Sequence, residues 1–436
     1  MKYAITTLGC KMNQFETQAM EQLLQQHGHT PTSAGDADVV IVNTCAVTAE
    51  SGRKSRQAVR RMLHENPGAF AAVCGCFSQI DPAEAEALGA RVVYGSGERA
   101  RFVAAVERAA ASQTGETRVD DPFRRMEIER LPGGALHGRT RAYLRIEDGC
   151  DNFCTYCVIP YARGRVRSLP LADVAAEAAR LAAEGFREIV VTGIEIASYG
   201  KDLRDGSGLA DALSAVTEAA PDARVRIGSL EPTVITEEFC AVLAAHPNIC
   251  RHFHLSLQSG CDSVLRAMHR HYDTAAFAAS TALLRRWFPG CALTADLIAG
   301  FPGETEENMQ ETLTFLRTQC FAALHVFPYS PRPGTKAAAM PGQLSRAEKE
   351  TRAARVKALA AEMHRAYLEA QLGKTLPVLF ETEEDGFWQG HAENYCLVRV
   401  RARAARGVIQ NVKILRCDDE ALFGTLEQQD SGGQTG

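Results

Sequence analysis

The stretch RIEDGCDNFCTYCVIPYARGRVRS, residues 145–168, holds three cysteines in one short loop. Cys150, Cys154 and Cys157 have the spacing CxxxCxxC, and they come soon after the strand-like run AYLRIE. Thiolates are the usual ligands of iron–sulfur clusters, and a cubane takes one ligand for each iron. Three thiolates leave one iron open, and an open coordination position favours catalysis over mere storage of electrons.

A zinc knuckle is the alternative interpretation of this loop. It would need a fourth cysteine or histidine nearby, and the loop contains none. A disulfide is disfavoured because we expect a cytoplasmic protein, and thiols stay reduced in that compartment. The first residues, MKYAITTLGC, do not form a signal peptide, and the chain has no 18-residue uncharged apolar run, so no membrane partner is expected.

The composition predicts a globular protein of two or three domains. The chain has 436 residues, of which 46% are apolar and 23% charged, with a formal net charge of -5. This mild charge does not indicate nucleic-acid binding, so any basic surface must be local.

Around the cysteine loop, six strand-like runs alternate with helical segments and predict an α/β fold. They are AYLRIE (142–147), EIVVTGI (188–194), RVRIGSL (224–230), FHLSLQ (253–258), LTADLIAGF (293–301) and ALHVFPY (323–329). Six β/α units indicate a partial (β/α)6 TIM-like barrel over residues 139–371, with functional residues at the carboxyl ends of its strands.

The flanking segments predict further units. Residues 1–113 alternate short apolar runs with amphipathic stretches, which is typical of a parallel α/β domain. Residues 114–138 are polar and contain Pro-Gly-Gly, which favours a linker. Residues 372–427 are rich in β-forming runs and predict a small β-barrel, followed by a short tail at 428–436.

A second set of cysteines lies in the first domain. Cys10 follows AITTLG, Cys45 follows VVIVNT, and Cys76 ends the run AFAAVCGC. Because the carboxyl ends of parallel strands share one edge of a sheet, we expect these thiols to converge and to hold a second cluster with an open iron. Cys74 lies inside its apolar run and should point into the core. The other cysteines are interpreted as small buried hydrophobes: Cys240, Cys250, Cys261, Cys291, Cys320, Cys396 and Cys417.

The loop at 150–157, with the aromatic Tyr156 before its last cysteine, resembles the radical S-adenosylmethionine (SAM) superfamily. The resemblance implies that the open iron chelates SAM and that its reductive cleavage yields a 5′-deoxyadenosyl radical. Gly193 and Glu195 fall where the family has a Gly-Gly-Glu stretch that contacts the methionine amino group, although Ile194 departs from that pattern. Further polar residues at strand ends are expected either to contact cofactor or substrate or merely to form turns: Ser229, Glu231, Gln258 and Asp296.

The segments LGCKMNQFET (8–17), VNTCAVT (42–48) and GCFSQ (75–79) resemble the N-terminal domain of the methylthiotransferases. This resemblance covers the chain from Lys2 to about Leu426. It implies a transferase with two [4Fe-4S] clusters and SAM, no catalytic side chains beyond the cluster ligands, and an electron donor such as flavodoxin or ferredoxin. We expect a monomer.

LGCK-x-NQ-x-ET and NTCAVT are most similar to the branch that acts on N6-threonylcarbamoyladenosine next to the anticodon of tRNA, with Met12 and Phe15 as mild departures. That branch converts t6A37 to ms2t6A37 at C2 of the base. The alternatives are the branches for isopentenyladenosine in tRNA, which favours GCQMN, and for a ribosomal-protein aspartate, which favours GCPKN. A non-catalytic iron–sulfur or zinc RNA-binding protein is the alternative from another class.

Local basic runs agree with an RNA substrate, because phosphate contacts give affinity and orientation. The last module resembles a TRAM domain, a small barrel that binds tRNA, with Phe387, Trp388 and Tyr395 available for stacking. A solvated face or a protected edge strand is the alternative for each run. The candidate RNA-binding residues fall in three runs: Arg53, Lys54, Arg56, Arg60 and Arg61, then Arg163 and Arg165 with Arg167 beside them, and then Arg399, Arg401 and Arg403.

Overall fold

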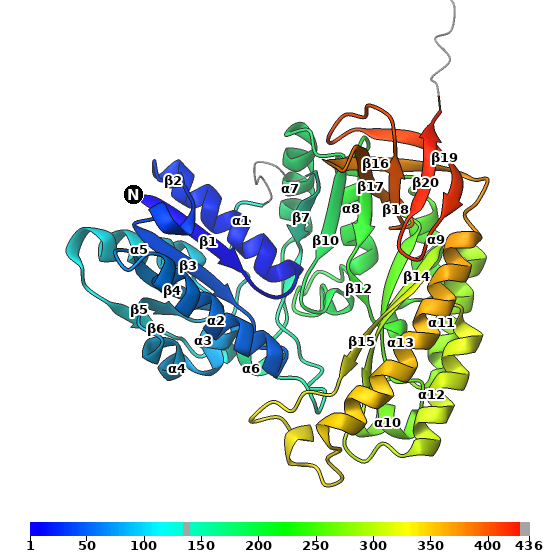
Figure 1. Ribbon diagram of the computed structural model, residues 1–436, viewed down its shortest axis with the longest axis horizontal. Coiled ribbons are helices and arrows are strands. Elements are labelled where there is room, and N and C mark those ends of the chain that lie inside the picture. Colours follow the sequence, from blue (N-terminus) through cyan, green and yellow to red (C-terminus); the bar gives the residue numbers. More distant parts are fainter. Residues whose placement is uncertain (134–139, 428–436) are drawn as a thin grey trace, which may run out of the picture.

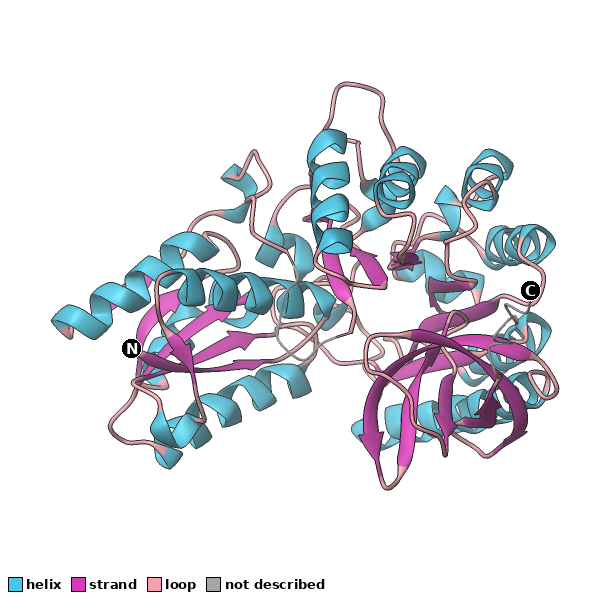
Figure 2. Ribbon diagram, turned by 90° about the horizontal axis from the view of Figure 1, so that it is seen from above, coloured by secondary structure: helices cyan, strands magenta, loops and turns pink. Residues whose placement is uncertain are grey.

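Three β-structures follow one another along the chain in the computed structural model, which describes residues 1–133 and 140–427 (Figure 1). The first is an open parallel sheet, the second a partial barrel of parallel strands, and the third a closed barrel of five strands. The N-terminal sheet and the closed barrel lie on different sides of the central unit (Figure 2). The predicted α/β fold is therefore confirmed.

The N-terminal sheet has the strand order β2-β1-β3-β4-β5-β6, and all of its strands are parallel. Its central strands are buried on both faces, as apolar runs such as VVIVNT predict. Helices α1 and α5 cover one face, and α2, α3 and α4 cover the other. The strands are β1 Lys2–Thr7, β2 Thr30–Pro31, β3 Val39–Thr44, β4 Phe70–Gly75, β5 Ala90–Tyr94 and β6 Glu116–Arg118. The helices are α1 Lys11–Gln26, α2 Ala49–Glu65, α3 Cys76–Ile80, α4 Pro82–Ala87 and α5 Arg99–Ser112.

The first part of the segment 114–138, which was expected to be a linker, contributes to this sheet. Strand β6 pairs with β5 at the sheet edge. Arg125 then pairs with Asp120 at 2.5 Å and donates to Gln79 at 2.9 Å, which ties the segment to α3. Strand β6 is short and polar, so its sequence carries no hydrophobic pattern. The end of the expected linker and the boundary at 138–139 lie outside the described residues.

The central unit has the six strand positions expected of a partial (β/α)6 barrel. One sheet has the order β11-β10-β7 and the other β12-β13-β14-β15, and β12 continues the path of β11 after Gly228. The strands are β7 Ala142–Arg145, β10 Glu188–Thr192, β11 Arg224–Ile227, β12 Ser229–Leu230, β13 His252–Gln258, β14 Ala292–Ala299 and β15 Ala323–Pro328. The covering helices are α7 Leu171–Ala183, α8 Leu209–Ala219, α9 Glu237–Ala244, α10 Asp262–Ala267, α11 Thr274–Trp287, α12 Glu306–Gln319 and α13 Arg346–Glu369.

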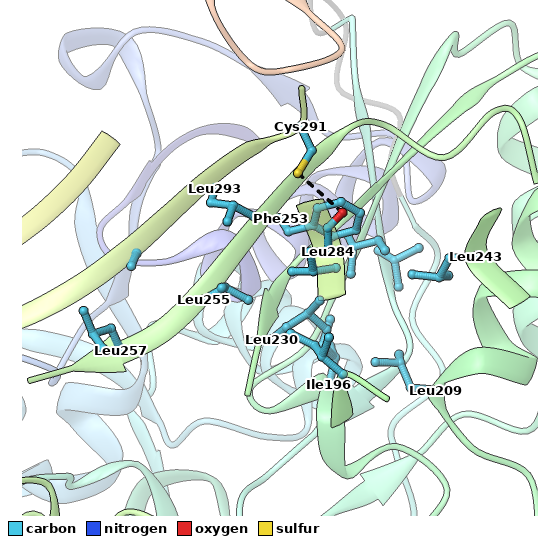
Figure 3. Packing of buried hydrophobic residues seen from close by; sticks show 14 of the residues in the cluster. Ile196, Leu209, Leu230, Leu243, Phe253, Leu255, Leu257, Leu284, Cys291 and Leu293 are labelled. Atoms are coloured by element: carbon cyan, nitrogen blue, oxygen red, sulfur yellow. Dashed lines mark hydrogen bonds between the residues drawn. The ribbon is translucent and has the colours of Figure 1, made fainter. Parts of the chain in front are cut away.

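The core of this unit lies between the strands and their helices. Leu255 and Leu293 project from neighbouring strands toward Leu284 of α11 (Figure 3). Because side chains alternate along a strand, the intervening residues of β13 and β14 face the inside of the barrel. A short antiparallel pair, β8 Glu147–Asp148 with β9 Arg167–Ser168, and helix α6 Ile159–Arg163 flank the cysteine loop.

The C-terminal module is a closed barrel with the strand order β16-β17-β18-β20-β19, so the predicted small β-barrel is confirmed. Its strands are β16 Thr375–Glu384, β17 Phe387–Ala392, β18 Leu397–Val400, β19 Ile409–Cys417 and β20 Leu422–Leu426. Strand β18 ends at Val400, so Arg401 and Arg403 lie beyond it. The predicted tail at 428–436 lies outside the described residues.

Arginines at the amino ends of the central strands hold the closed barrel in place. Arg224 donates to the backbone oxygens of Pro377 and His391, and Arg226 donates to those of Ala392 and Glu393. In the described part of the chain, no helix is both long and apolar enough to cross a membrane.

Candidate active site

The cysteine loop of the central unit is fixed by backbone hydrogen bonds. Cys150 N–H donates to Gly164 O at 3.0 Å, and Cys157 N–H donates to Cys154 O at 2.9 Å. Thr155 N–H donates to Met268 O at 3.1 Å, which anchors the loop to the turn after α10. Cys154 is buried, whereas Cys150 and Cys157 are partly exposed. The loop therefore presents its thiols from a fixed scaffold.

An arginine that the sequence reading missed lies beside this loop. Arg270 donates to Cys154 Sγ at 3.0 Å and forms an ion pair with Glu231. Asn152 of the loop also donates to Glu231, at 3.2 Å. Arg270 could not be identified from the sequence, because it lies far from the cysteines along the chain and no local motif distinguishes it.

The second set of thiols converges at the carboxyl edge of the N-terminal sheet, as predicted. Gly75, which precedes Cys76, has a φ of +111°, and an added Cβ would lie 2.4 Å from Thr44 O. Gly9, which precedes Cys10, has the same φ, and its Cβ would lie 2.9 Å from Cys45 Sγ. The two glycines thus allow the three strand ends to approach closely, because no side chain stands between them.

Two of these cysteines also stand at helix starts. Cys10 is the N-cap of α1, and Cys76 is the first residue of α3. Helix N-termini favour negative charge and so favour the thiolate. Asn13 donates to Leu8 O at 2.7 Å and to Thr44 O at 2.9 Å, which ties the Cys10 and Cys45 loops together.

Arg163, which follows the cysteine loop in the chain, contacts the N-terminal set of cysteines and was wrongly predicted to contact RNA. Its side chain is fully buried, and its Nε donates to Cys76 Sγ at 3.2 Å. It also forms an ion pair with Glu16 of α1, and its other terminal nitrogen donates to Asn13 at 3.1 Å. Arg167 is likewise buried, where it pairs with Asp148 at 3.2 Å. The basic run at 163–167 is therefore mostly internal, and Arg165 alone of its three arginines is exposed.

This buried network carries more positive than negative charge. Its members are Arg99, Arg145, Arg163 and Arg167 against Glu16 and Asp148. Burial opposes ionisation of Asp148, yet the arginines outweigh it and hold the pKa of Asp148 at about 2. Positive charge beside Cys76 suits a group held by thiolates.

The donor set tests which metal group fits. Each site offers three thiols, and a cubane cluster takes one thiolate on each of three irons and leaves the fourth iron open. A structural zinc ion takes four ligands, so three thiols alone do not complete its coordination. All fourteen cysteines have free thiols, so the donor set fits an iron–sulfur cluster at each site.

The two sets face one another across the junction of the units. Cys10, Cys45 and Cys76 interact electrostatically with one another, and Cys76 also interacts with Cys157 of the other set. Burial raises the pKa of Cys157 to about 12, so without a metal its thiol stays protonated.

The residues expected to contact SAM fall into two groups. Gly193, Glu195 and Glu231 surround the cysteine loop: Glu195 N–H donates to Glu147 at 2.8 Å, and Gly193 packs on the same carboxyl. Burial, reinforced by Glu231, raises the pKa of Glu195 to about 8. Glu147 is fully buried with one unpartnered oxygen, and burial holds its pKa well above the usual range.

Of the remaining candidates, Ser229, Gln258 and Asp296 lie on strands of the barrel, whereas Tyr156 lies in the cysteine loop itself. Ser229 is exposed in β12, and Gln258 ends β13 with a left-handed φ of 64°. Tyr156 packs against the apolar cluster around Phe301. Asp296 lies beside two histidines: the Nε2 of His254 is 3.3 Å from its carboxylate, and the side chains of Asp296, His254 and His325 lie within 4.8 Å of one another.

The predicted RNA-binding residues outside the 163–167 run are accessible. On α2, Arg53, Lys54, Arg60 and Arg61 are exposed, and Arg56 is half-buried against Glu84. On the closed barrel, Arg399 and Arg401 line a hollow of about 370 Å³ together with Arg416, Phe387 and Phe423. Arg403 is exposed in the loop beyond β18.

Of the three aromatic residues expected to stack on bases, Phe387 lies in this hollow, with Arg401 over its ring at 4.7 Å. Trp388 packs against the barrel core instead. Tyr395 lies at the junction with the central unit, stacked on His252 and covered by Arg141 and Arg226.

The other cysteines mostly behave as small core residues. Cys74 is fully buried on the face covered by α1, as expected. Cys240, Cys250, Cys261, Cys291 and Cys396 are also buried. The prediction is wrong for Cys320, which is exposed at the end of α12, and Cys417 is partly exposed.

Comparison with known proteins agrees with this geometry. The model of the family described as Uncharacterized protein family UPF0004 matches residues 2–95, and that of the radical SAM superfamily matches residues 144–316. Among solved structures, the radical S-adenosylmethionine methyltransferase TsrM from Kitasatospora setae covers 77% of this chain and is covered to 77% of its own length, with a TM-score of 0.57. At 17% identity, that likeness shows a shared fold alone.

Sequence relatives extend over nearly the whole chain. Threonylcarbamoyladenosine tRNA methylthiotransferase MtaB of Bacillus subtilis is 38% identical over 95% of this chain and 93% of its own length. The MtaB of Thermotoga maritima is 36% identical over 93% and 95%. The tRNA-2-methylthio-N(6)-dimethylallyladenosine synthase of Moorella thermoacetica is 33% identical over 97% and 98%. On this similarity along its whole length, the chain belongs to the methylthiotransferase family of radical SAM enzymes.

Proposed function

We propose that this chain is a transferase that adds a methylthio group to C2 of N6-threonylcarbamoyladenosine next to the anticodon of tRNA. The observation that carries the proposal is the juxtaposition of two three-cysteine sites: Arg163, six residues after the last cysteine of the barrel loop, donates to Cys76 Sγ of the N-terminal site at 3.2 Å. The relatives named for threonylcarbamoyladenosine, at 38% and 36% identity, favour that nucleoside over dimethylallyladenosine.

In this proposal each set of thiolates holds one [4Fe-4S] cluster: Cys10, Cys45 and Cys76 in the N-terminal unit, and Cys150, Cys154 and Cys157 in the barrel. With SAM bound, the two sites would together supply reductive cleavage of SAM and a methylated sulfur. The residues of the chain bring these functions together. Arg163 and Arg270 each donate a hydrogen bond to one cysteine sulfur and place a positive charge beside each site.

SAM is proposed to lie between the cysteine loop and the turn after β10. Glu195 can accept from the methionine ammonium, and Glu147 behind it accepts from Glu195 N–H and so holds the turn. Gly193, Tyr156, Ser229 and Gln258 complete the proposed contacts. Glu231 is committed to Arg270, so we expect it to orient that arginine and Asn152 while it lines the site.

Anaerobic reconstitution and tRNA analysis test the proposal. About eight irons per chain and SAM-dependent 5′-deoxyadenosine are expected. Mass spectrometry of tRNA nucleosides should show the methylthio derivative of threonylcarbamoyladenosine disappear when the gene is deleted and return with the wild-type gene. Loss of the dimethylallyl derivative instead would assign the chain to the other tRNA branch, and bound zinc without SAM cleavage would support a non-catalytic RNA-binding protein.

The accessible arginines and lysine on α2, together with Arg165, Arg399, Arg401 and Arg403, are proposed to contact tRNA phosphates. Each lost phosphate contact should weaken binding for all sequences and reduce the slope of log affinity against log salt concentration by about one unit. Arg401→Ala is the sharpest variant, because its guanidinium also covers Phe387.

A small acidic one-electron carrier such as flavodoxin or ferredoxin is the proposed electron donor. A hollow of about 160 Å³ is lined by Cys154 and Cys157 together with Phe153, Tyr161 and Lys336. Phe123 stacks on Phe153, and Arg124 next to it has an 87% exposed side chain. This basic and aromatic rim is complementary to an acidic partner. An electron would then have a short path from the partner to the cysteine loop.

Lys336→Glu should slow reduction by an acidic carrier in a salt-dependent way while leaving reduction by dithionite unchanged. Lys357→Glu, on the exposed face of α13, is the matched control and should have no effect. Equal slowing by both substitutions would place the carrier elsewhere.

The remaining proposals concern organisation. We propose a cytoplasmic monomer, which size-exclusion chromatography with light scattering tests. Residues 1–113 form the N-terminal cluster-binding domain, 139–371 the radical SAM domain and 372–427 the TRAM-like domain, with 114–138 connecting the first two.

A further inference from the structure

The inner face of the partial barrel carries three potential metal ligands that the proposed chemistry leaves unused. His254, Asp296 and His325 lie on the adjacent strands β13, β14 and β15, and each offers a ligand atom within 4.8 Å of the other two. Asp296 is in register with His325. Their neighbours Leu255 and Leu297 point the other way, into the core. Regular strand pairing therefore brings the three polar side chains together on one face.

The separation of His254 and Asp296 matches that of two ligands on one metal ion. His254 Nε2 lies 3.3 Å from Asp296 Oδ2. Zn–N and Zn–O bonds of about 2.0–2.1 Å at tetrahedral angles place two ligand atoms roughly 3.4 Å apart. His325 is exposed on the edge strand β15, so a small rotation of its side chain can bring a ring nitrogen to the same distance.

A threonine fixes the ring of His254. Thr294 Oγ1 lies 2.9 Å from Nδ1 of His254 and 3.1 Å from Nε2 of His252. When Thr294 donates to His252, it accepts from Nδ1–H of His254, and the Nε2 of His254 then carries a lone pair that faces Asp296. A metal-bound histidine is normally held in this way, through its second ring nitrogen. A cation between Nε2 and the carboxylate satisfies both acceptors.

The alternative is an ordinary hydrogen bond between a histidine and a carboxylate. If Thr294 instead donates to His254 Nδ1, then Nε2–H donates to Asp296 and no ion is needed. This alternative gives His325 no role. The rings of His325 and His254 lie 5.5 Å apart, and among the described residues the ring nitrogens of His325 have no hydrogen-bond partner. One of them is therefore free to serve as a third ligand.

We propose that His254, Asp296 and His325 bind one divalent transition-metal ion, with Thr294 as a positioning residue. Two imidazole nitrogens and one carboxylate oxygen favour Zn2+ or Fe2+ over Mg2+ and Ca2+, which take oxygen ligands. Three protein ligands leave at least one coordination position open toward the inside of the barrel. The ion ties the edge strand β15 to β13 and β14.

This ion is additional to the iron of the two cysteine sites, so the assignment goes beyond the proposed function. Asp296, which was expected to contact SAM, becomes a metal ligand instead.

Zinc binding to the full-length, cluster-loaded protein tests the assignment. Anaerobic equilibrium dialysis against Zn2+, followed by metal analysis, should give about one zinc ion per chain in the wild type, with the iron content and the visible spectrum unchanged. His325→Gln removes a ligand at an exposed position and should weaken this binding about 100-fold or more. Thr294→Val keeps the three ligands and the shape of the side chain, and it should weaken binding about tenfold to 100-fold through the lost hydrogen bond.

A second pair of histidines supplies the matched control. His27 Nδ1 and His29 Nε2 lie 2.7 Å and 2.8 Å from the same carboxylate oxygen of Glu107 in the N-terminal unit. His29→Gln should leave zinc binding at the wild-type value. Zinc should also raise the midpoint of thermal unfolding of the wild type, because a ligand that binds the folded state stabilises it. The midpoint of His325→Gln should not respond.

Three results would overturn the assignment. Absence of zinc binding by the wild type with intact clusters would make the group an ordinary hydrogen-bonded network. Wild-type binding in His325→Gln would place the ion elsewhere, for example at the exposed thiol of Cys320. Loss of binding in His29→Gln would place it beside Glu107. None of these results involves tRNA, so the proposed function stands or falls separately, on the analysis of tRNA nucleosides.

Discussion

The cysteine thiols form two separate sites, and the proposed reaction uses each site for a different step. Cys10 belongs to the N-terminal site, and its sulfur lies at the start of α1, outside the loop that holds Cys150, Cys154 and Cys157. Replacing it should disturb one site and spare the other.

Cys10→Ala should lose about half of the iron and all methylthio product, because three thiolates are needed at each site. It should still form 5′-deoxyadenosine from SAM, because the loop at 150–157 is untouched. Iron analysis and chromatography of SAM products measure both. Cys74→Ala is the matched control, since its thiol lies in the core nearby; it should cost about 1 kcal/mol of stability and keep both activities. Loss of SAM cleavage in Cys10→Ala would mean that the sites are not separable.

Arg163 should set the reduction potential of the N-terminal site. A cation that donates to Cys76 Sγ stabilises the more negative, reduced state of any group held there. Arg163→Met should therefore lower that potential, on the order of 60 mV, which is tenfold for one electron. An EPR-monitored redox titration measures the shift.

Arg99→Met provides the comparison for Arg163→Met. Arg99 is equally buried and pairs with Glu16 at 3.0 Å, but its guanidinium donates to the oxygens of Glu16, Gly95 and Gly97 and not to a ligand sulfur. Both variants remove a buried ion pair and should lose about 3–5 kcal/mol of stability. A potential shift of equal size in both would show that overall charge, and not the hydrogen bond to Cys76, controls the site.

The cysteines could be predicted from the sequence at this scale, because each follows a recognisable strand. Whether each basic residue is buried or exposed could not be predicted. Arg163 and Arg165 look alike in sequence, yet Arg163 is buried and forms an ion pair with Glu16 of α1, a residue far away along the chain, whereas Arg165 is exposed. Arg270 was missed for the same reason, since its partners Cys154 and Glu231 come from other elements.

Strand ends and the turns after them position the thiols at the scale of elements. Gly75 links β4 to α3 and lets Cys76 face Cys10 and Cys45. Gly75→Ala should displace Cys76, because the new Cβ would lie 2.4 Å from Thr44 O and φ is +111°. We expect a loss of more than about 2 kcal/mol in stability and loss of the N-terminal cluster, with SAM cleavage retained.

Gly28→Ala is the control for Gly75→Ala, because it introduces backbone strain without a steric clash that would displace neighbouring residues. Gly28 also has a positive φ, of +81°, but nothing lies within 4 Å of an added Cβ. It should cost about 1 kcal/mol and leave both clusters in place. Differential scanning fluorimetry and iron content measure the two effects, and a fully loaded Gly75→Ala protein would contradict the proposed role of this turn.

Long apolar strands were predictable at this scale, and short polar ones were not. The β/α order of the barrel follows from runs such as LTADLIAGF, whose burial is confirmed by β14. Strand β6 and the early end of β18 depend on pairing with β5 and β17, which local sequence does not report.

At the scale of the whole molecule, one buried carboxylate holds the closed barrel in place. It lies at the amino ends of the central strands, where the closed barrel is attached. Glu188 pairs with Arg224 at 2.5 Å and with Arg226 at 2.8 Å, and these arginines hold the backbone of the closed barrel. The order of the units was predictable from the sequence, but this junction was not, because the backbone oxygens that the arginines bind belong to the C-terminal module, far away along the chain.

The pH dependence of stability should reveal this junction. Burial opposes ionisation of Glu188, but the arginines outweigh it and hold its pKa well below the usual range. A carboxyl group whose pKa is depressed by folding contributes stability that is complete above its unfolded pKa, near 4.3, and is lost as the pH falls further. Thermal unfolding should therefore show little change from pH 7 to pH 5 on account of Glu188, and a decline below about pH 4.5.

Glu188→Gln should remove this contribution. At pH 7 it leaves two buried guanidiniums without their counter-charge, which should cost about 3–5 kcal/mol, and its stability should fall less steeply than that of the wild type below pH 4.5. Glu381→Gln is the matched control, because Glu381 is partly exposed and pairs with Arg141 and His391 at the edge of the same junction. It should cost about 1 kcal/mol or less. Parallel pH curves for the wild type and Glu188→Gln would show that this carboxylate does not hold the closed barrel in place.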